Sequence, residues 1–233
     1  LDNFDEDSVK RIAKAAGEGG ADLLDVASQP DLIRSAIDAS GLPVCVSAIE
    51  PNLFVESVKA GATMIEIGNF DSFYLKGRFF SSKEVLSLAI ETRNLLPQTV
   101  LSVTVPHVLP LDEQAQLAID LVEEGADIIQ TEGGKSVTPV SPGVLGLLEK
   151  AAPTLAATHT ISQAFSKEGI HVPILCASGL SEVTAPMAIA VGASGVGVGS
   201  AVNRLNEEIA MIAAVKSLRD AIPSLISVTS NGC

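Results

Sequence analysis

A glycine–alanine turn recurs four times along the chain, each time after a stretch of helical periodicity and before a short apolar run. The four copies are Gly20-Ala21-Asp22, Gly61-Ala62-Thr63, Gly125-Ala126-Asp127 and Gly192-Ala193-Ser194. A glycine just past a helix can adopt the left-handed conformation that ends the last turn, which suits it to a short loop from helix to strand. The repeat therefore predicts alternating helices and strands, and this alternation is typical of a parallel sheet.

The periodicity between these turns predicts the individual elements. Helices are expected at residues 5–17, 30–39, 51–60, 82–96, 111–124, 142–151, 161–168, 184–191 and 201–219. Strands are expected at residues 22–27, 43–48, 63–68, 99–105, 127–131, 154–158, 173–177 and 195–199. Eight strands close a (β/α)₈ barrel, which commonly takes about 250 residues. We therefore predict one α/β domain over residues 1–233, a (β/α)₈ TIM barrel of parallel strands.

The beginning of the chain does not fit a complete barrel. Residues 1–4 are followed almost at once by a helical pattern, whereas a parallel α/β domain normally opens with a strand. We expect the first strand, and any targeting peptide, to lie upstream of Leu1. One of the eight visible candidates must then fail. The weakest is 154–158, Thr-Leu-Ala-Ala-Thr, which is short and lacks β-branched apolar residues.

Charge and composition exclude several classes of function. The formal net charge of −13 argues against a nucleic-acid partner or an anionic membrane surface. No apolar run reaches the roughly 18 residues that span a bilayer, so membrane insertion is not expected. Cys45, Cys176 and Cys233 show no metal-binding or CxxC spacing and are expected to be reduced thiols.

Alternation along the predicted strands shows which side chains face the barrel axis. In each strand, every second residue is aliphatic and is expected to pack against the helices, so the residues between them point inward. The inward set is polar or small: Asp25, Cys45, Ser47, Glu66, Gly68, Ser102, Thr104 and Gln130. Carboxylates are costly to bury without partners. A satisfied internal network is one interpretation, but a functional pocket with Asp25 and Glu66 as catalytic candidates is favoured.

Two glycine-rich turns predict an anion site. Ser178 and Gly179 end the predicted strand at 173–177, and Gly197, Gly199 and Ser200 lead from the last strand into the helix expected from residue 201. Glycine lets the backbone approach a ligand, and a helix N-terminus presents unpaired N–H groups to an anion. Barrels often hold phosphate after their last two strands. The alternative is that the glycines only relieve crowding inside a narrow barrel.

Further candidates follow other strands. His107 and Glu132 each come just after a strand end, where either could act as a general acid or base. Lys135 lies in the same turn as Glu132 and is a candidate for cofactor binding, but it is not on a strand, which weighs against Schiff-base chemistry. His159 is a weaker candidate. No spacing requires a metal.

An aromatic stretch occupies one loop between a predicted strand and helix. Residues 70–80 hold five of the eight aromatic residues of the chain and also include Lys76 and Arg78. A loop of this length at the active face of a barrel is typical of a lid or a partner surface. The alternative is a small cluster packed over the end of the barrel.

Several motifs resemble the hypothetical chloroplast open-reading-frame 23 family of cyanobacteria, algal plastids and plants. They are LDNFD (1–5), LLDVAS (23–28), PVCVSAIEPNLF (43–54), EIGNFDSFY (66–74), LSVTVPH (101–107), QTEGG (130–134), LCASGLSEVTAPMAIA (175–190) and GVGVGSAVN (195–203). The resemblance covers nearly the whole chain. It implies a phosphate- or flavin-binding barrel, with the anion at Ser178, Gly179, Gly197, Gly199 and Ser200, located in the chloroplast stroma or in a cyanobacterial cytoplasm. It implies no reaction.

Two functions remain open. The first is an enzyme, either of the lyase or isomerase type or dependent on FMN, that acts on a small phosphorylated molecule with Glu66, His107 or Glu132 as acid or base. Flavin has less support, because no cationic residue is obviously placed for its ring, although Lys135 could serve. The second is a non-catalytic ligand-sensing or assembly subunit of a plastid complex. A homo-oligomer is a separate possibility, which would count against this second function.

Overall fold

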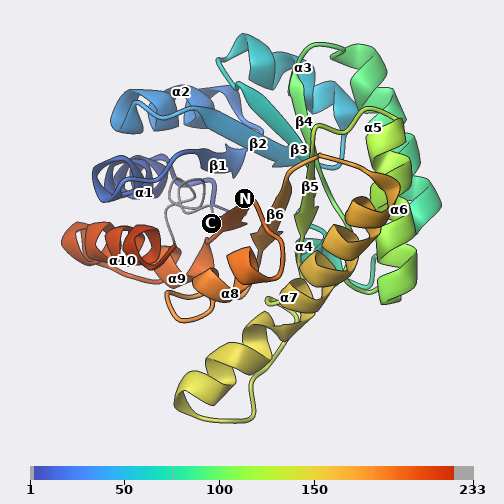
Figure 1. Ribbon diagram of the computed structural model, residues 1–233. Helices are drawn as coiled ribbons and strands as arrows, with labels where there is room; N and C mark the ends of the chain where they lie inside the picture. Colours follow the sequence, from blue (N-terminus) through green and yellow to red (C-terminus); the bar gives the residue numbers. More distant parts are fainter. Residues whose placement is uncertain (1–2, 75, 223–233) are drawn as a thin grey trace, which may run out of the picture.

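The computed structural model describes residues 3–74 and 76–222. Seven strands form one parallel sheet in chain order: β1 (Leu24–Ala27), β2 (Val44–Ala48), β3 (Met64–Ile67), β4 (Val100–Thr104), β5 (Ile128–Thr131), β6 (Ile174–Ala177) and β7 (Gly195–Gly197). The sheet curls around one axis, with the long helices outside it (Figure 1). The predicted TIM-barrel architecture is confirmed, but the barrel is not closed. Within the described residues, β1 and β7 each pair on one side only.

Ten helices are present in the described part of the chain. They are α1 (Glu6–Gly19), α2 (Pro30–Ser40), α3 (Pro51–Lys59), α4 (Asp71–Tyr74), α5 (Ser82–Leu95), α6 (Leu111–Glu123), α7 (Gly143–Glu168), α8 (Ala185–Ala190), α9 (Ser200–Asn203) and α10 (Glu208–Ala221). The four repeated glycines Gly20, Gly61, Gly125 and Gly192 all have positive φ, between 86° and 113°. The repeat therefore has the structural role that the sequence predicted. None of the described helices is both long enough and apolar enough to cross a bilayer.

The strand expected at 154–158 is wrong, because these residues lie inside the 26-residue helix α7. This helix also joins the two helices predicted at 142–151 and 161–168. Thr154 and Thr158, one turn apart, both hydrogen-bond Thr131 at the end of β5, at 2.6 and 3.0 Å. The spacing of four residues places both hydroxyls on the sheet-facing side of a helix. Buried positions continue through Ile161 and Phe165 with the same helical period.

The long helix expected at 201–219 is instead divided in two. α9 is a single turn, and α10 begins only at Glu208. The end of β7 therefore leads into a one-turn helix and not into the long helix expected at 201–219. A one-turn helix adds little dipole at its N-terminus, so any anion site here must rely mainly on the turn itself.

Helices bridge the gap between the two edge strands of the sheet, β1 and β7. α1 packs against α2 on one side and α10 on the other (Figure 1). A Cβ atom on Gly19 would lie 2.5 Å from Cβ of Val215, so the absence of a side chain permits the close approach of α1 and α10. Lys14 also pairs with Glu208 across this seam, at 2.7 Å. Helix contacts thus hold together the two edge strands, which do not hydrogen-bond each other.

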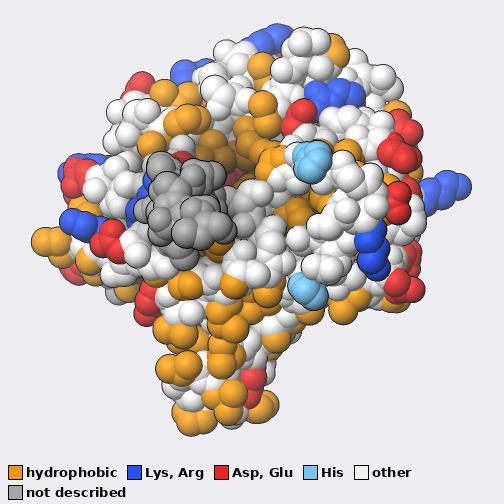
Figure 2. Space-filling view, in the orientation of Figure 1, with side chains coloured by type: hydrophobic (Ala, Val, Ile, Leu, Met, Phe, Trp, Pro, Cys, Tyr) orange, Lys and Arg blue, Asp and Glu red, His pale blue; other side chains and the backbone are white. Residues whose placement is uncertain are grey.

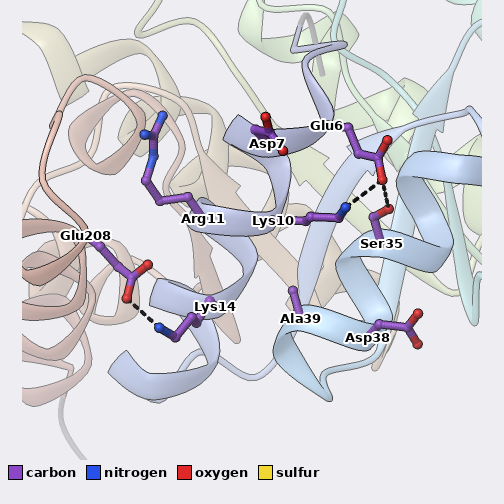
Figure 3. Close-up of a pocket in the computed structure, with 9 residues that line it drawn as sticks. All are labelled: Glu6, Asp7, Lys10, Arg11, Lys14, Ser35, Asp38, Ala39 and Glu208. Atoms are coloured by element: carbon purple, nitrogen blue, oxygen red, sulfur yellow. Dashed lines mark hydrogen bonds and ion pairs between the residues drawn. The ribbon is translucent and has the colours of Figure 1, made fainter.

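A hollow on the outside of these helices is lined mainly by charged side chains from α1 and α2, together with Glu208 (Figure 3). Its lysines already pair with carboxylates: Lys10 with Glu6, and Lys14 with Glu208. None of the site residues predicted from the sequence lines this hollow.

Gly19→Val tests the α1–α10 seam. The new side chain would overlap Val215, so we expect the free energy of unfolding to fall by about 1–3 kcal/mol. The measurement is urea denaturation monitored by circular dichroism. Glu18→Val, at the exposed neighbouring position of the same helix, should change stability by less than about 0.5 kcal/mol. Equal effects of the two substitutions would show that the seam does not depend on the missing side chain.

Candidate functional site

Polar side chains from five adjacent strands meet on the barrel axis. Ser47 donates a hydrogen bond to Asp25 Oδ1 at 2.8 Å. Thr104 Oγ1 and Gln130 Nε2 donate to Glu66 Oε1 at 2.8 and 2.7 Å. Residues of the opposite parity contact the helices instead, as Thr131 contacts α7. The inward orientation predicted from strand alternation is therefore present, and these polar residues form one connected region.

Glu66 is the most buried carboxyl group of this region, with 2 % of its surface exposed. Burial and, to a smaller extent, the negative charge of nearby Asp25 together raise its pKa to about 8. Oxygens of the two carboxyl groups lie within 4.8 Å of each other. Like charges this close, with one of them buried, do not both ionise readily. Glu66 is therefore a protonated acid at neutral pH.

The surroundings of Glu66 keep it in place. A Cβ atom on Gly68 would lie 2.1 Å from Glu66 Oε1, so only glycine leaves room for this carboxyl group. Ser102, its partner in the register of β3 and β4, is fully buried, and its hydroxyl has no hydrogen-bond partner among the described residues. A ligand oxygen on the axis would satisfy such a hydroxyl, whose burial without a partner is costly.

Asp25 differs from Glu66 because it lies on the edge strand β1 and is exposed, and loss of hydration raises its pKa only to about 6, below that of Glu66. The two acids thus differ in exposure and in pKa, and Asp25 is the one that loses its proton at the lower pH. Between them, Cys45 is fully buried. Burial raises the pKa of its thiol, and the neighbouring carboxyl groups add to the rise. Cys45 is therefore a neutral thiol and not a nucleophilic thiolate.

A second group of titratable side chains lies at the carboxyl ends of β3, β4 and β5. His107 Nδ1 lies 3.2 Å from Glu132 Oε1 and 3.6 Å from Asp71 Oδ1. The Tyr74 hydroxyl donates to Glu132 Oε1 at 2.6 Å, and Ser136 donates to Asp71 Oδ1 at 2.7 Å. His107 and Glu132, predicted separately from the sequence, are thus brought together.

The hydrogen bonds of this second group shift the pKa of its members. Burial alone would lower the pKa of His107, but the hydrogen bond to Glu132, with the charges of Glu132 and Asp71, raises it above its ordinary value. Burial, together with the negative charges of Glu132 and Asp71, raises the pKa of Tyr74, which stays a phenol that donates to Glu132.

The predicted aromatic loop forms a packed cluster that also reaches this site. Phe70 and Phe80 are buried, with ring centroids 4.4 Å apart. The Tyr74 ring contacts that of His107 edge-on at 5.1 Å. Arg78 covers the Phe80 ring and pairs with Glu84, so it does not supply positive charge to the site. The cluster interpretation describes the loop better than a free lid.

The first predicted anion turn faces the second group. Ser178, in a left-handed conformation with φ 72°, accepts from the Lys135 amide at 3.0 Å and donates to Asp71 Oδ2 at 3.2 Å. Gly134 and Gly179 touch backbone to backbone, so a Cβ atom on Gly134 would lie 2.4 Å from Gly179 Cα. The Lys150 side chain passes beside Gly179. The backbone of Lys135 and the side chain of Lys150 therefore flank this turn.

The second predicted anion turn is more open. Among the described residues, a Cβ atom on Gly199 would meet only Asn203 Nδ2, at 4.0 Å, whereas one on Gly197 would lie 2.9 Å from Cβ of Ala177. Ser200 begins α9, so its N–H has no partner inside the helix. The two turns follow adjacent strands, paired as Ala177 with Gly197. Binding of phosphate at these turns stays a prediction.

Sequence reasoning missed Asp71, Tyr74 and Lys150. Asp71 follows the end of β3 by only a few residues, which is the same signal that identified His107 and Glu132. Tyr74 reaches the site because it lies on the short helix α4, and Lys150 because it lies on α7 beside Gly179. No local sequence pattern indicated either position. His159 lies on α7 facing a groove against α6, away from both groups. Cys233 lies outside the described residues.

Glu66→Gln tests the protonation of the buried acid. A raised pKa in the folded state means that folded protein holds a proton that the unfolded chain releases, so the free energy of unfolding should fall as pH rises from about 4.5 to about 8. Glutamine cannot ionise, so the variant should lose this slope and be more stable than the parent above pH 8, by on the order of 1–3 kcal/mol. Urea denaturation across this pH range measures both. Identical slopes would contradict a protonated Glu66.

Solved structures resemble this fold over nearly its full length. A 3-hexulose-6-phosphate synthase superposes with a TM-score of 0.67 at 16 % identity, covering 96 % of this chain and 97 % of that one. A putative deoxyribose-phosphate aldolase from Toxoplasma gondii gives 0.62 at 20 % identity, covering 98 % and 92 %. A thiamine phosphate pyrophosphorylase from Pyrococcus furiosus gives 0.58 at 17 % identity, covering 91 % and 88 %. Identities this low establish the shared fold alone.

Closer relatives are found by sequence. The Uncharacterized protein ycf23 of Cyanophora paradoxa is 44 % identical over 214 residues, covering 91 % of this chain and 85 % of that protein. The Porphyra purpurea protein of the same name is 38 % identical over 231 residues, covering 99 % and 85 %. Residues 1–227 match the model of the family described as "Protein of unknown function (DUF561)". The chain therefore belongs to the DUF561 family, together with the plastid-encoded ycf23 proteins of algae.

Proposed function

We propose that this protein is an enzyme of the plastid stroma that binds a phosphate-bearing small molecule at the carboxyl edge of its sheet and moves protons on it. The observation that carries the proposal is the pair of unlike carboxyl groups on the axis. Glu66 is buried and protonated, and exposed Asp25 lies within 4.8 Å of it. Two titratable groups held in opposite protonation states by their environments are a recurrent arrangement for acid–base catalysis.

The pair suits removal of a proton from a carbon next to a carbonyl group. Ionised Asp25 would take the proton from carbon, and Glu66 would give its proton to the carbonyl oxygen, leaving an enediol. In an isomerisation, Asp25 would then return its proton to the other carbon of the enediol, and the second hydroxyl would give its proton back to Glu66 as the new carbonyl forms. In a lyase reaction, Asp25 would instead take the proton of a hydroxyl group β to the carbonyl, so that the carbon–carbon bond between them breaks into an aldehyde and an enediol whose oxygen takes its proton from Glu66. The seven described strands carry no lysine, so a Schiff base on a strand does not contribute.

The phosphate part of the proposal has separate support. The Ser178–Gly179 turn lies beside the backbone N–H of Lys135 and the side chain of Lys150, which are a donor and a cation in a chain of net charge −13. As far as the described residues show, Gly199 leaves space beside the N–H groups that begin α9. In a barrel completed by one strand between β7 and β1, these turns would follow the seventh and eighth strands, where barrel enzymes often hold phosphate. The names of the three structural neighbours also refer to phosphorylated compounds.

FMN is a second phosphate-bearing ligand that this site would accept. Lys135 is the cation at hand for the flavin ring, and its Nζ donates to Ser72 Oγ at 3.1 Å in this structure. Visible absorbance of the protein as purified from a plastid source distinguishes this case, because bound flavin is yellow. A colourless protein argues for a sugar phosphate or a similar metabolite.

One observation favours the alternative of a non-catalytic assembly subunit. The beginning of α7 and the loop before it project from the body of the molecule with apolar side chains exposed (Figure 2), and Val140 is 92 % exposed. Val144 and Leu145 are also exposed there, at 57 % and 56 %. A stable heteromeric complex on gel filtration of a plastid extract supports this alternative. A homo-oligomer or a monomer counts against it.

The phosphate site is tested by a matched pair of substitutions at Gly199. Its φ of −113° and the open space beside it allow a side chain, so both variants should fold. Gly199→Glu places a negative charge in the turn and should abolish binding of inorganic phosphate, measured by isothermal titration calorimetry. Gly199→Gln has the same size without the charge and should retain binding within about tenfold of the parent. Equal loss in both, or no binding in the parent, would contradict the site.

The acid–base pair is tested by proton exchange. A panel of ketose and aldose phosphates is incubated with the protein in D₂O and followed by proton NMR. We expect exchange of a carbon-bound proton in at least one compound, and a decrease of at least about a hundredfold in Asp25→Asn and Glu66→Gln. Exchange that survives both substitutions would show that another group moves the proton.

A further inference from the structure

Three side chains of the kind that bind metal ions converge from separate loops. Asp71 begins α4, His107 follows β4 and Glu132 follows β5. One ligand atom from each lies within 4.8 Å of the others. The exposed fractions of the three side chains are 5 %, 14 % and 6 %. The sequence spacing did not require a metal site, and only folding brings these residues together.

The distances fit a coordination shell. A tetrahedral ion with bonds of about 2.0–2.1 Å places neighbouring ligand atoms about 3.3–3.4 Å apart. His107 Nδ1 lies 3.2 Å from Glu132 Oε1 and 3.6 Å from Asp71 Oδ1. Small rotations of these side chains would therefore suffice to place an ion among the three atoms.

The charges of the group also favour a cation. Asp71 and Glu132 are nearly buried, and His107 is the only side chain in an ion pair with either of them in the described part of the chain. Two buried carboxylates with a single partner that can carry a positive charge are poorly compensated. A divalent ion would balance both charges and leave the histidine as a neutral ligand. Tyr74 and Ser136, which donate to the carboxylates, would orient them as second partners commonly do at metal sites.

The other cluster of ligand-type residues, Asp25, Cys45 and Glu66, fits a metal less well. Burial favours the protonated forms of Glu66 and Cys45, and both must lose a proton before they can bind an ion. The two clusters thus differ in their chemistry. The barrel axis retains protons, whereas the group at the loops offers a histidine nitrogen and two carboxylates.

We propose that Asp71, His107 and Glu132 form a binding site for one divalent first-row transition-metal ion. A mixed set of one imidazole and two carboxylates suits Zn²⁺ or Mn²⁺ better than Mg²⁺ or Ca²⁺, which prefer oxygen ligands alone. Ser178 connects the site to the first predicted anion turn, because its hydroxyl donates to Asp71 Oδ2 at 3.2 Å. The proposal does not depend on phosphate binding or on catalysis.

Titration of the full-length, chelator-treated protein with Zn²⁺, and separately with Mn²⁺, tests the site by calorimetry. We expect one ion per chain, with affinity at least about tenfold lower in Asp71→Asn, His107→Gln and Glu132→Gln. Glu66→Gln alters the other cluster, and Asp112→Asn alters an exposed acid on α6. Both should bind as the parent does. Absence of binding in the parent, or loss of binding in Glu66→Gln but not in the three site variants, would overturn the proposal.

A second measurement needs no variant of the site and so does not depend on how the variants fold. The chain has three histidines, and Mn²⁺ broadens the NMR signals of nearby nuclei. Sub-stoichiometric Mn²⁺ should broaden the imidazole signals of His107 and leave those of His159 and His171 sharp. Equal broadening of all three, or none, would contradict binding at this place.

Discussion

Parallel pairing of consecutive strands is the constraint on which the rest of this structure depends. Because β1 to β7 are paired in chain order and all run in the same direction, every loop that follows a strand emerges at the same edge of the curled sheet. Residues as distant in sequence as Asp71 and Ser178 therefore meet within hydrogen-bonding distance. The same pairing places alternate residues of each strand on one axis, where a closed core of aliphatic side chains would otherwise form.

The polar axis and the connected loops form a layered site. Glu66, with Thr104 and Gln130, lies within the curl of the sheet. Glu132 is two residues beyond Gln130 on the same strand and loop, so the network of His107, Tyr74 and Asp71 lies one layer nearer the edge. The negative charge of Glu132 contributes to the raised pKa of Glu66. The pKa of Glu66 on the axis thus depends on the charge of the outer layer.

Much of the fold and part of the site could be predicted from the sequence, because both follow from short periodic patterns. Gly20 and its three counterparts marked the turns, and the aliphatic residues alternating with Asp25 and Glu66 identified the inward positions. The strand predicted at 154–158 was wrong because so short a segment, with Thr at both ends, is compatible with either a strand or a helix. The helical spacing of buried residues along the whole of α7 is what distinguishes the two. The one-turn α9 was likewise hidden within a continuous helical pattern.

Contacts between distant loops are what the sequence did not predict. Asp71 and Tyr74 became parts of the site because the 70–74 segment folds back onto Glu132, and Lys150 because α7 passes beside Gly179. Ser178 was expected to serve an anion turn, but its hydroxyl also accepts from the Lys135 amide and donates to Asp71. Such partners depend on the relative placement of whole elements, which is set by packing across the sheet and not by neighbours in sequence.

The central claim is that the carboxyl edge of this sheet binds a phosphorylated small molecule. Mass spectrometry of the compounds released on denaturing the protein, purified from a plastid source without phosphate buffers, tests it most directly. We predict one phosphorus-containing compound in near-stoichiometric amount, which is lost when Gly199→Glu is purified in the same way and retained with Gly199→Gln. Release of no phosphorus-containing compound from the parent protein, or equal release from the parent and Gly199→Glu, would contradict the account.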